Sequence, residues 1–247
     1  MTKIIALVTG GTGGIGTEVC RELHSQDRKV IAVCLPEEKI QAERWLKEMR
    51  GEGIDTDIVT ADVSSFESCE QMVSQVKERF GNIEILVNCA GVTRDKTLQK
   101  MDHNQWKAVI NTNLDSLFNV TRNVVQDMVD KGFGRVVNIS SVNGQKGQYG
   151  QTNYSAAKAG VHGFTMALAQ EVAARGVTVN TISPGYVDTR MTAAIPTEIK
   201  DQIVTTIPLG RMAQPVEIAQ AVGFFCLEKT AYITGANLPV NGGMYMS

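Results

Sequence analysis

The chain has 247 residues, of which 24 are Lys or Arg and 26 are Asp or Glu, leaving a net charge of −2. This balance excludes a protein that binds nucleic acid or a membrane surface through bulk charge. The five cysteines form no CxxC pair, which is typical of a reducing compartment. The first apolar segment, from Ile4, is too short for a signal peptide or a membrane span, so we expect a cytoplasmic protein.

Short β-branched apolar segments alternate with longer amphipathic segments along the chain. The predicted strands begin at Lys3, Lys29, Asp55, Glu84, Gly134, Gly176 and Ala236. Helical patterns such as TEVCRELHSQ and FNVTRNVVQDMV lie between them. Most of the strands are apolar on both faces, as expected for a parallel sheet covered by helices. The pattern predicts one doubly wound, Rossmann-type α/β domain over residues 1–247, with seven parallel strands.

One segment, at about 187–215, breaks this alternation. It follows a predicted strand, is long, and contains Pro196 and Pro208. We interpret it as a substrate lid, although an ordinary long connection would have the same composition.

A glycine-rich loop, TGGTGGIG at residues 9–16, joins the first predicted strand to a helix. Glycines let the backbone turn tightly and approach a pyrophosphate, while the helix N-terminus supplies N–H groups. Two registers fit, because Gly11, Gly13 and Gly16 match G-x-G-x-x-G while Gly10, Gly14 and Gly16 match T-G-x-x-x-G-x-G. Both predict a nicotinamide dinucleotide cofactor.

The end of the second predicted strand bears on the choice between NAD and NADP. An acidic residue there would bind the ribose hydroxyls of NAD, but the strand ends near Cys34 and Leu35. Glu37 and Glu38 could be ribose ligands, or they could complement the dipole of the next helix. We prefer the second interpretation, which favours NADP, with Lys39 as the only nearby cation.

Tyr154 and Lys158 are four residues apart, a spacing that puts them on one face of a helix. They could begin a surface helix or form an active site. Ketone reduction needs a proton donor, and a free Tyr has a pKa of roughly 10. A cation at ~4 Å would lower that pKa by up to about three units before desolvation. The three histidines share no ligand spacing, so we expect no metal site.

Several motifs together resemble the short-chain dehydrogenase/reductase family over the whole chain. They are TGGTGGIG, Asp62-Val63, NCAG at 88–91, Asn113, Ser141, YSAAK at 154–158 and SPGYVDT from Ser183. The resemblance selects the register of Thr9, Gly10, Gly14 and Gly16. It implies a cofactor site formed by Thr9, Gly10, Thr12, Gly14, Ile15, Gly16, Lys39, Asp62, Val63, Asn88, Ala90, Gly91, Tyr154, Lys158, Pro184, Gly185, Val187 and Thr189.

The resemblance also implies a catalytic set of Asn113, Ser141, Tyr154 and Lys158. Tyr154 would protonate the substrate, Lys158 would tune Tyr154 and bind the ribose, and Ser141 rather than Ser140 would donate to the carbonyl oxygen. Asn113 would hold a water next to Lys158. The other interpretation is a buried Asn that bonds to backbone, and the two roles can coexist.

The segment at residues 138–180, from NISSVNGQKGQ to GVTVN, is similar in particular to members that reduce acetoacetyl-CoA to (R)-3-hydroxybutyryl-CoA with NADPH in polyhydroxybutyrate synthesis. That similarity implies an acyl-CoA site that includes Ser141, Gln148, Tyr149, Gln151, Tyr154 and Tyr186, and a homotetramer. Asp95 and Lys100, in the loop after the fourth predicted strand, could add polar contacts to the CoA arm, or they could belong to a solvated loop. The nearest alternative is a 3-oxoacyl-[acyl-carrier-protein] reductase, to which Lys131 and Arg175 could offer a basic patch. A catalytically idle NADP-binding regulator is an alternative of a different class.

Overall fold

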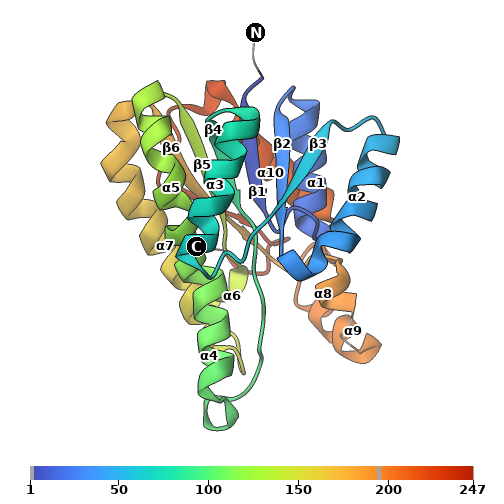
Figure 1. The fold of residues 1–247 in the computed structure, drawn as a ribbon. Coiled ribbons are helices and arrows are strands. Elements are labelled where there is room, and N and C mark those ends of the chain that lie inside the picture. The colour runs from blue at the N-terminus through green and yellow to red at the C-terminus, as the bar shows by residue number, and fades with distance from the viewer. Residues whose placement is uncertain (1–2, 194–195, 247) are drawn as a thin grey trace.

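The structure of the chain is a computed structural model, which describes residues 3–193 and 196–246 (Figure 1). Its sheet has seven strands, all parallel, in the order β3-β2-β1-β4-β5-β6-β7. The strands are β1 (Ile5–Thr9), β2 (Lys29–Cys34), β3 (Thr56–Thr60), β4 (Ile83–Asn88), β5 (Gly134–Ile139), β6 (Val177–Pro184) and β7 (Asn237–Val240). This architecture confirms the predicted doubly wound parallel sheet.

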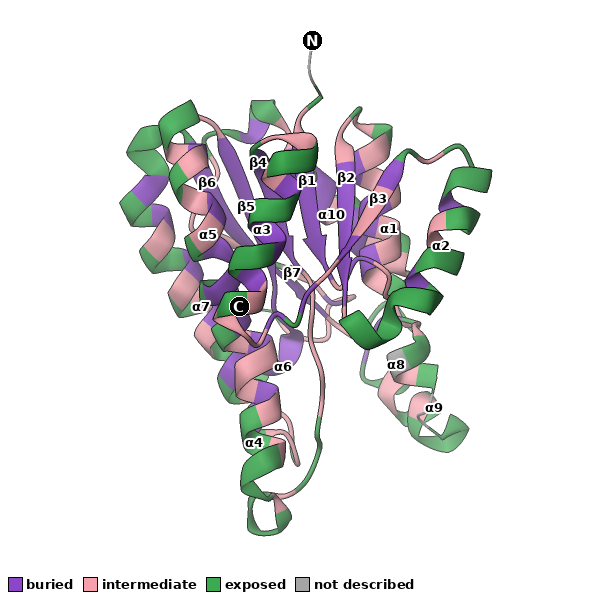
Figure 2. Ribbon diagram, viewed as in Figure 1, coloured by how far each residue is buried: buried purple, intermediate pink, exposed green. Residues whose placement is uncertain are grey.

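Two layers of helices cover the sheet. The helices are α1 (Gly14–Ser25), α2 (Lys39–Gly51), α3 (Phe66–Phe80), α4 (His103–Ile110), α5 (Ser116–Lys131), α6 (Val142–Lys146), α7 (Thr152–Val172), α8 (Arg190–Ala193), α9 (Thr197–Thr205) and α10 (Pro215–Cys226). One core cluster joins the sheet to α1, α2 and α10, and a second joins it to α3, α5 and α7. Figure 2 shows that the strands are buried whereas each outer helix keeps an exposed face.

The alternation of side chains along the strands produces these two cores. In β1, Leu7 packs with the cluster of α3, α5 and α7, and its neighbours Ala6 and Val8 pack with the opposite cluster. All three side chains are fully buried. A strand covered on both faces therefore has to be apolar at every position, which is the pattern that the sequence shows.

The order of the strands positions the site. The chain runs from β1 to β2 and β3 on one side and continues with β4 on the other, so β1 lies between β2 and β4. In open α/β sheets, ligands bind beyond the carboxyl ends of the strands where the order reverses. Thr9 and Asn88, which end β1 and β4, pair at this point.

The segment at 187–215 lies beyond the carboxyl ends of the strands and contains α8 and α9 (Figure 1). Its two ends lie side by side, because Val187 pairs with Ala213 in an isolated parallel bridge. A further bond, from Leu209 N–H to Gly242 O at 3.1 Å, connects the segment to the residues after β7. The predicted lid also includes residues 194 and 195, which lie outside the described part of the chain. Its role as a lid stays a prediction.

Within residues 3–193 and 196–246, no helix is both long enough and apolar enough to cross a membrane.

Candidate active site at the carboxyl ends of the strands

The glycine loop between β1 and α1 depends on close backbone contacts. A Cβ on Gly16 would lie 2.1 Å from Gly10 O, and one on Gly10 would lie 3.0 Å from Ala90 Cα. A Cβ on Gly14 would lie 2.8 Å from Thr189 Cγ2, whereas one on Gly13 would approach nothing more closely than Gly10 O, at 3.2 Å. A Cβ on Gly11, which belongs to the other register, would lie 2.7 Å from Ala32 Cβ, so both registers contain close contacts and the choice of Gly10, Gly14 and Gly16 stays a prediction.

The N-terminus of α1 offers a set of backbone donors. The N-cap residue, Gly13, contributes no side-chain hydrogen bond. Among the described residues, none accepts a hydrogen bond from the N–H groups of Thr12, Gly14, Ile15 or Gly16. Unpaired N–H groups at a helix N-terminus bind anions, and the glycine contacts leave no side chain in the way. The loop therefore fits the pyrophosphate of a dinucleotide cofactor.

The end of β4 is attached to this loop by Thr9. Its hydroxyl accepts hydrogen bonds from Cys89 N–H at 3.0 Å and Ala90 N–H at 3.1 Å. Asn88, by contrast, donates from its amide to Asn138 Oδ1 at 2.8 Å and to Thr121 Oγ1 at 3.3 Å. The NH₂ group of Asn88 therefore bonds to the protein core, and any cofactor contact of this residue falls to its side-chain oxygen or its backbone.

The residues predicted at the adenosine end lie beyond β2 and β3. Asp62 is exposed, and its carboxylate accepts from Ser64 N–H at 2.9 Å and from the Ser64 hydroxyl at 2.7 Å. Val63 is buried, and Asn119 donates to its carbonyl at 3.0 Å. Glu37 lies in a short 3-10 turn, Pro36–Glu38, that precedes α2, and the exposed Lys39 begins α2 itself.

The turn after β6 lies against the glycine loop. Thr189 Cγ2 limits the space at Gly14, and Val187 is buried beside its bridge partner Ala213. Gly185 permits another close approach, since a Cβ there would lie 2.9 Å from Asn241 Cα. Pro184 ends β6 and is buried. The structure thus brings together two segments that are far apart in the sequence and that are both predicted to contact the cofactor.

Tyr154 and Lys158 lie one turn apart in α7. The Lys158 ammonium is 5.7 Å from the centroid of the Tyr154 ring and donates to Ile139 O at 2.7 Å. Lys158 is buried, with 4% of its surface exposed. The Ser140 hydroxyl donates to the backbone carbonyl of Lys158 at 2.7 Å, which fits a structural role for Ser140.

The ionisation of this pair is dominated by burial. Burial raises the pKa of Tyr154 to about 12, against an opposing effect of the adjacent Ser141 side chain. Burial lowers the pKa of Lys158 to about 8. The expectation that Lys158 lowers the pKa of Tyr154 is therefore not met in this structure, because desolvation of the phenol outweighs any effect of the cation. Tyr154 is accordingly a protonated phenol near neutral pH.

Ser141 is the N-cap of α6, and this position leaves its hydroxyl hydrogen available for donation. Its hydroxyl oxygen accepts a hydrogen bond from Asn143 N–H at 3.1 Å. A hydroxyl has one donor hydrogen, and accepting this bond leaves that hydrogen free. Ser141 can therefore donate to a carbonyl oxygen next to Tyr154.

Asn113 lies in a π-helical turn, Asn111–Asp115, between α4 and α5. Its fully buried amide donates to Val92 O and Val109 O, both at 2.9 Å. Both amide hydrogens thus bond to backbone, which is one of the two roles predicted for Asn113. A Cβ on Gly91 would lie 2.7 Å from Asn113 Oδ1 and 3.6 Å from Lys158 Nζ, so these groups are neighbours. The water next to Lys158 stays a prediction.

Of the residues predicted to bind substrate, Asp95 and Gln151 are connected to Ser141 by hydrogen bonds within the described part of the chain, whereas Gln148, Tyr149 and Lys100 are not. Gln151 contacts Asp95 and lies near Ser141, to which Asn143 connects it. The sequence did not indicate that Asn143 contacts this group. The available signal was its position, two residues after the predicted catalytic Ser141. The others are Gln148, whose side chain accepts from Lys146 at 3.3 Å, Tyr149, which is 87% exposed, and the exposed Lys100.

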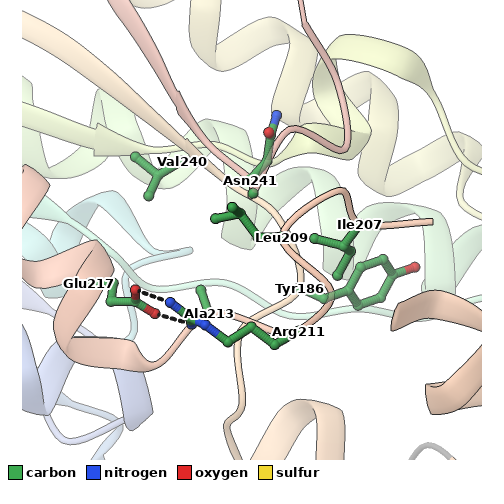
Figure 3. Close-up of a pocket in the computed structure, with 9 residues that line it drawn as sticks. Tyr186, Ile207, Leu209, Arg211, Ala213, Glu217, Val240 and Asn241 are labelled. Atoms are coloured by element: carbon green, nitrogen blue, oxygen red, sulfur yellow. Dashed lines mark hydrogen bonds and ion pairs between the residues drawn. The ribbon is translucent and has the colours of Figure 1, made fainter. Parts of the chain in front are cut away.

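Tyr186 lines a separate small cavity of about 80 Å³ between the end of β6, the return of the 187–215 segment and the start of α10 (Figure 3). Arg211 and Glu217 form an ion pair at 2.7 Å on its wall. Neither Ser141 nor Tyr154 lines this cavity. The cavity is therefore separate from the Ser141–Tyr154–Lys158 cluster, where the sequence predicts the chemistry, and includes only Tyr186 of the predicted substrate residues.

Among the residues that the structure describes, no group of three or more His, Cys, Asp or Glu side chains is arranged to hold a metal ion.

Known proteins resemble this chain over its full length. The family model described as short chain dehydrogenase matches residues 4–200. The acetoacetyl-CoA reductase of Allochromatium vinosum is 59% identical over 242 residues, which are 98% of each chain. The acetoacetyl-CoA reductase of Cupriavidus necator is 50% identical over 246 residues, covering 100% of each. A 3-oxoacyl-[acyl-carrier-protein] reductase of Haemophilus influenzae is 44% identical over 243 residues, 98% of each.

Replacement of Gly16 by Ala tests the glycine loop. The added Cβ would lie 2.1 Å from Gly10 O, so the backbone must move and the N–H groups of the loop lose their arrangement. We expect the Kd for a nicotinamide dinucleotide to rise at least about tenfold. Gly163→Ala in α7, where a Cβ meets nothing within 4 Å, is the control. Fluorescence titration measures both, and wild-type affinity in Gly16→Ala would contradict the loop's assignment.

Proposed function

This chain belongs to the short chain dehydrogenase family, and we propose that it reduces acetoacetyl-CoA to (R)-3-hydroxybutyryl-CoA with NADPH. The observation that carries the proposal is the cluster of Ser141, Tyr154 and Lys158 beside a glycine loop with free N–H groups. The chain is an oxidoreductase by its family. Its full-length similarity to two acetoacetyl-CoA reductases supports the choice of substrate.

The reaction divides between the cofactor and the side chains. A bound nicotinamide cofactor supplies the hydride. Tyr154 donates its phenolic proton to the carbonyl oxygen, and its raised pKa keeps that proton in place until the oxygen becomes basic. Ser141 donates a hydrogen bond to the same oxygen, since accepting from Asn143 N–H leaves its hydroxyl hydrogen available.

Lys158 supports the proton transfer. Its ammonium lies over the Tyr154 ring, so it stabilises the negative charge that develops on the phenol oxygen. Burial makes this attraction stronger than it would be in water. Asn113 bonds to Val92 and Val109 beside Gly91 and so keeps the space next to Lys158 Nζ defined.

The cofactor is proposed to be NADPH rather than NADH. The last residue of β2 is Cys34 and the next is Leu35, so neither terminal position of the strand carries a carboxylate, and we interpret Glu37 and Glu38, in the turn beyond, as complementing the dipole of α2. Lys39, exposed at the start of α2, could approach a 2′-phosphate, as could the side chain of Thr12. Thr9, Gly10 and the other predicted cofactor residues would hold the pyrophosphate, adenosine and nicotinamide parts.

The second candidate is reduction of a 3-oxoacyl-[acyl-carrier-protein], favoured by the full-length relative from Haemophilus influenzae. A carrier protein is acidic, so that activity benefits from exposed cations. Lys131 is bound in an ion pair with the buried Glu84, which weakens it as a contact, whereas Arg175 is exposed. A catalytically idle NADP-binding regulator would not need the Ser141–Tyr154–Lys158 arrangement.

We also propose a cytoplasmic homotetramer that serves polyhydroxybutyrate synthesis. Exposed apolar side chains on the outer helices, such as Phe118 in α5 and Met166 in α7, support contact with other copies. Light scattering of the purified chain measures the assembly.

Rates with two substrates and two cofactors test the specific assignment. Oxidation of NADPH or NADH is followed by absorbance with acetoacetyl-CoA or an acetoacetyl-carrier protein. We expect acetoacetyl-CoA with NADPH to give the highest kcat/KM, since β2 ends at Cys34 and Leu35 rather than at a carboxylate and Lys39 begins the following helix. A higher kcat/KM with the carrier substrate would favour the second candidate, and preference for NADH would contradict the cofactor proposal.

Replacement of Tyr154 by Phe removes the proposed proton donor. We expect turnover to fall by at least roughly a thousandfold, the scale of general acid catalysis together with its charge stabilisation. Cofactor binding and the melting temperature should stay close to those of the wild type, because the ring is retained. Tyr232→Phe, at a fully exposed position, is the matched control. Turnover of Tyr154→Phe within a few-fold of the wild type would refute this mechanism.

The pH dependence of reduction should follow Lys158. Its pKa of about 8 means that the ammonium is charged below this pH and loses its proton above it. We therefore expect kcat/KM to fall above about pH 8, while Tyr154, whose pKa is about 12, stays protonated. Lys158→Arg keeps its charge to higher pH and should move the decline upward, at a lower maximal rate. An unmoved decline would assign it to another group.

A further inference from the structure

A chain of hydrogen bonds connects the loop after β4 to Ser141. Gln151 Nε2 donates to Asp95 Oδ2 at 2.7 Å, and Asn143 Nδ2 donates to Gln151 Oε1 at 2.9 Å. Asn143 also donates from its backbone N–H to Ser141 Oγ at 3.1 Å. One residue, Asn143, thus contacts both the proposed catalytic serine and the predicted substrate side.

The direction of this chain follows from the charge of Asp95. An ionised carboxylate only accepts hydrogen bonds, so Gln151 has to turn its NH₂ group toward Asp95. Its carbonyl oxygen then faces Asn143, which has to offer a donor in turn. Asp95 therefore determines the orientation of two successive amides.

Asn143 is held in this orientation although its own carbonyl gains nothing from it. The residue is 7% exposed, and its Oδ1 is buried with no hydrogen-bond partner among the described residues. Turning the amide over would put this oxygen against Gln151 Oε1, which is repulsive. A buried oxygen without a partner is costly. The bond to Gln151 is what opposes that cost.

The backbone around the chain is already fixed by other contacts. Lys96 N–H donates to Gly150 O at 2.9 Å, and the buried Asn153 donates to Arg94 O at 3.2 Å. The loop after β4 would therefore keep its place without Gln151. What the side-chain bonds add is the orientation of the Asp95 carboxylate, whose charge acts on both Tyr154 and Tyr186.

We propose that Asn143 is a positioning residue for substrate binding, which acts through Gln151 to hold the Asp95 carboxylate toward the amide N–H and hydroxyl donors of a pantetheine arm. This inference rests on the proposed acyl thioester reduction. Asn143 affects binding of the arm, and because its backbone N–H serves Ser141 in any variant except proline, it leaves the chemical step in place.

Replacement of Asn143 by Asp turns a hydrogen-bond donor to Gln151 into an acceptor. Gln151 then has a carboxylate on each side, and its carbonyl oxygen must face one of them. We expect KM for acetoacetyl-CoA to rise roughly tenfold, the effect of one misdirected hydrogen bond to a charged group, with kcat within a few-fold of the wild type. Ethyl acetoacetate has no pantetheine arm, so its kcat/KM should change little.

The decisive comparison introduces Asn143→Asp into a variant protein that already carries Asp95→Asn. With Asp at 143 and Asn at 95, Gln151 can turn over, donate to the carboxylate at 143 and accept from the amide at 95. The chain of bonds is complete again, in the opposite direction. We therefore expect the roughly tenfold KM penalty of Asn143→Asp to disappear in the Asp95→Asn background.

An equal penalty in both backgrounds would overturn the proposal, as would an equal penalty with ethyl acetoacetate. Melting temperatures of all four proteins distinguish loss of the fold from loss of binding. The wild-type rate with acetoacetyl-CoA tests the proposed function by itself. If the wild type prefers a carrier-bound acyl group, the same comparison is made on that substrate, which also has a pantetheine arm.

Discussion

The active-site region is organised around one buried cation. The Lys158 ammonium is removed from water and donates to Ile139 O at the end of β5. Such a charge is costly unless hydrogen bonds compensate it, so the surrounding backbone has to approach it closely. Gly144 in α6 lets the backbone pack closely against α7 at the same residue, since a Cβ there would lie 2.7 Å from the Lys158 carbonyl carbon. Ser140 bonds the same part of α7, and Tyr154 lies one turn away.

A second set of polar bonds holds α7 against the sheet behind this cation. Asn88 in β4 donates to Asn138 in β5, Asn138 donates to Thr165 in α7, and Thr165 shares a hydrogen bond with Thr181 in β6. These side chains are buried and bonded to one another, as buried polar groups must be. The network joins three strands to the helix that carries Tyr154 and Lys158, so the sheet and the site are one structure.

The sequence predicted the strands and their parallel arrangement, because buried strands in a parallel sheet are apolar on both faces. It also predicted Tyr154 and Lys158 as neighbours from helical spacing alone. The π-helical turn at Asn111–Asp115 could not be predicted, since it depends on bonds from Asn113 to Val92, a residue in a distant loop. The raised pKa of Tyr154 could not be predicted either, because it also depends on residues distant in the sequence. Spacing indicates which charges are near, but burial depends on the whole fold.

The segment between Val187 and Ala213 can change in length without altering the sheet. Its two ends are joined by a bridge next to β6, so residues can be added or removed between them without altering the strand register. The entropic cost of closing a longer loop grows only slowly with its length. The length of this segment and the sheet beside it can thus vary separately, so a longer or shorter segment need not disturb Tyr154 or Lys158 in α7.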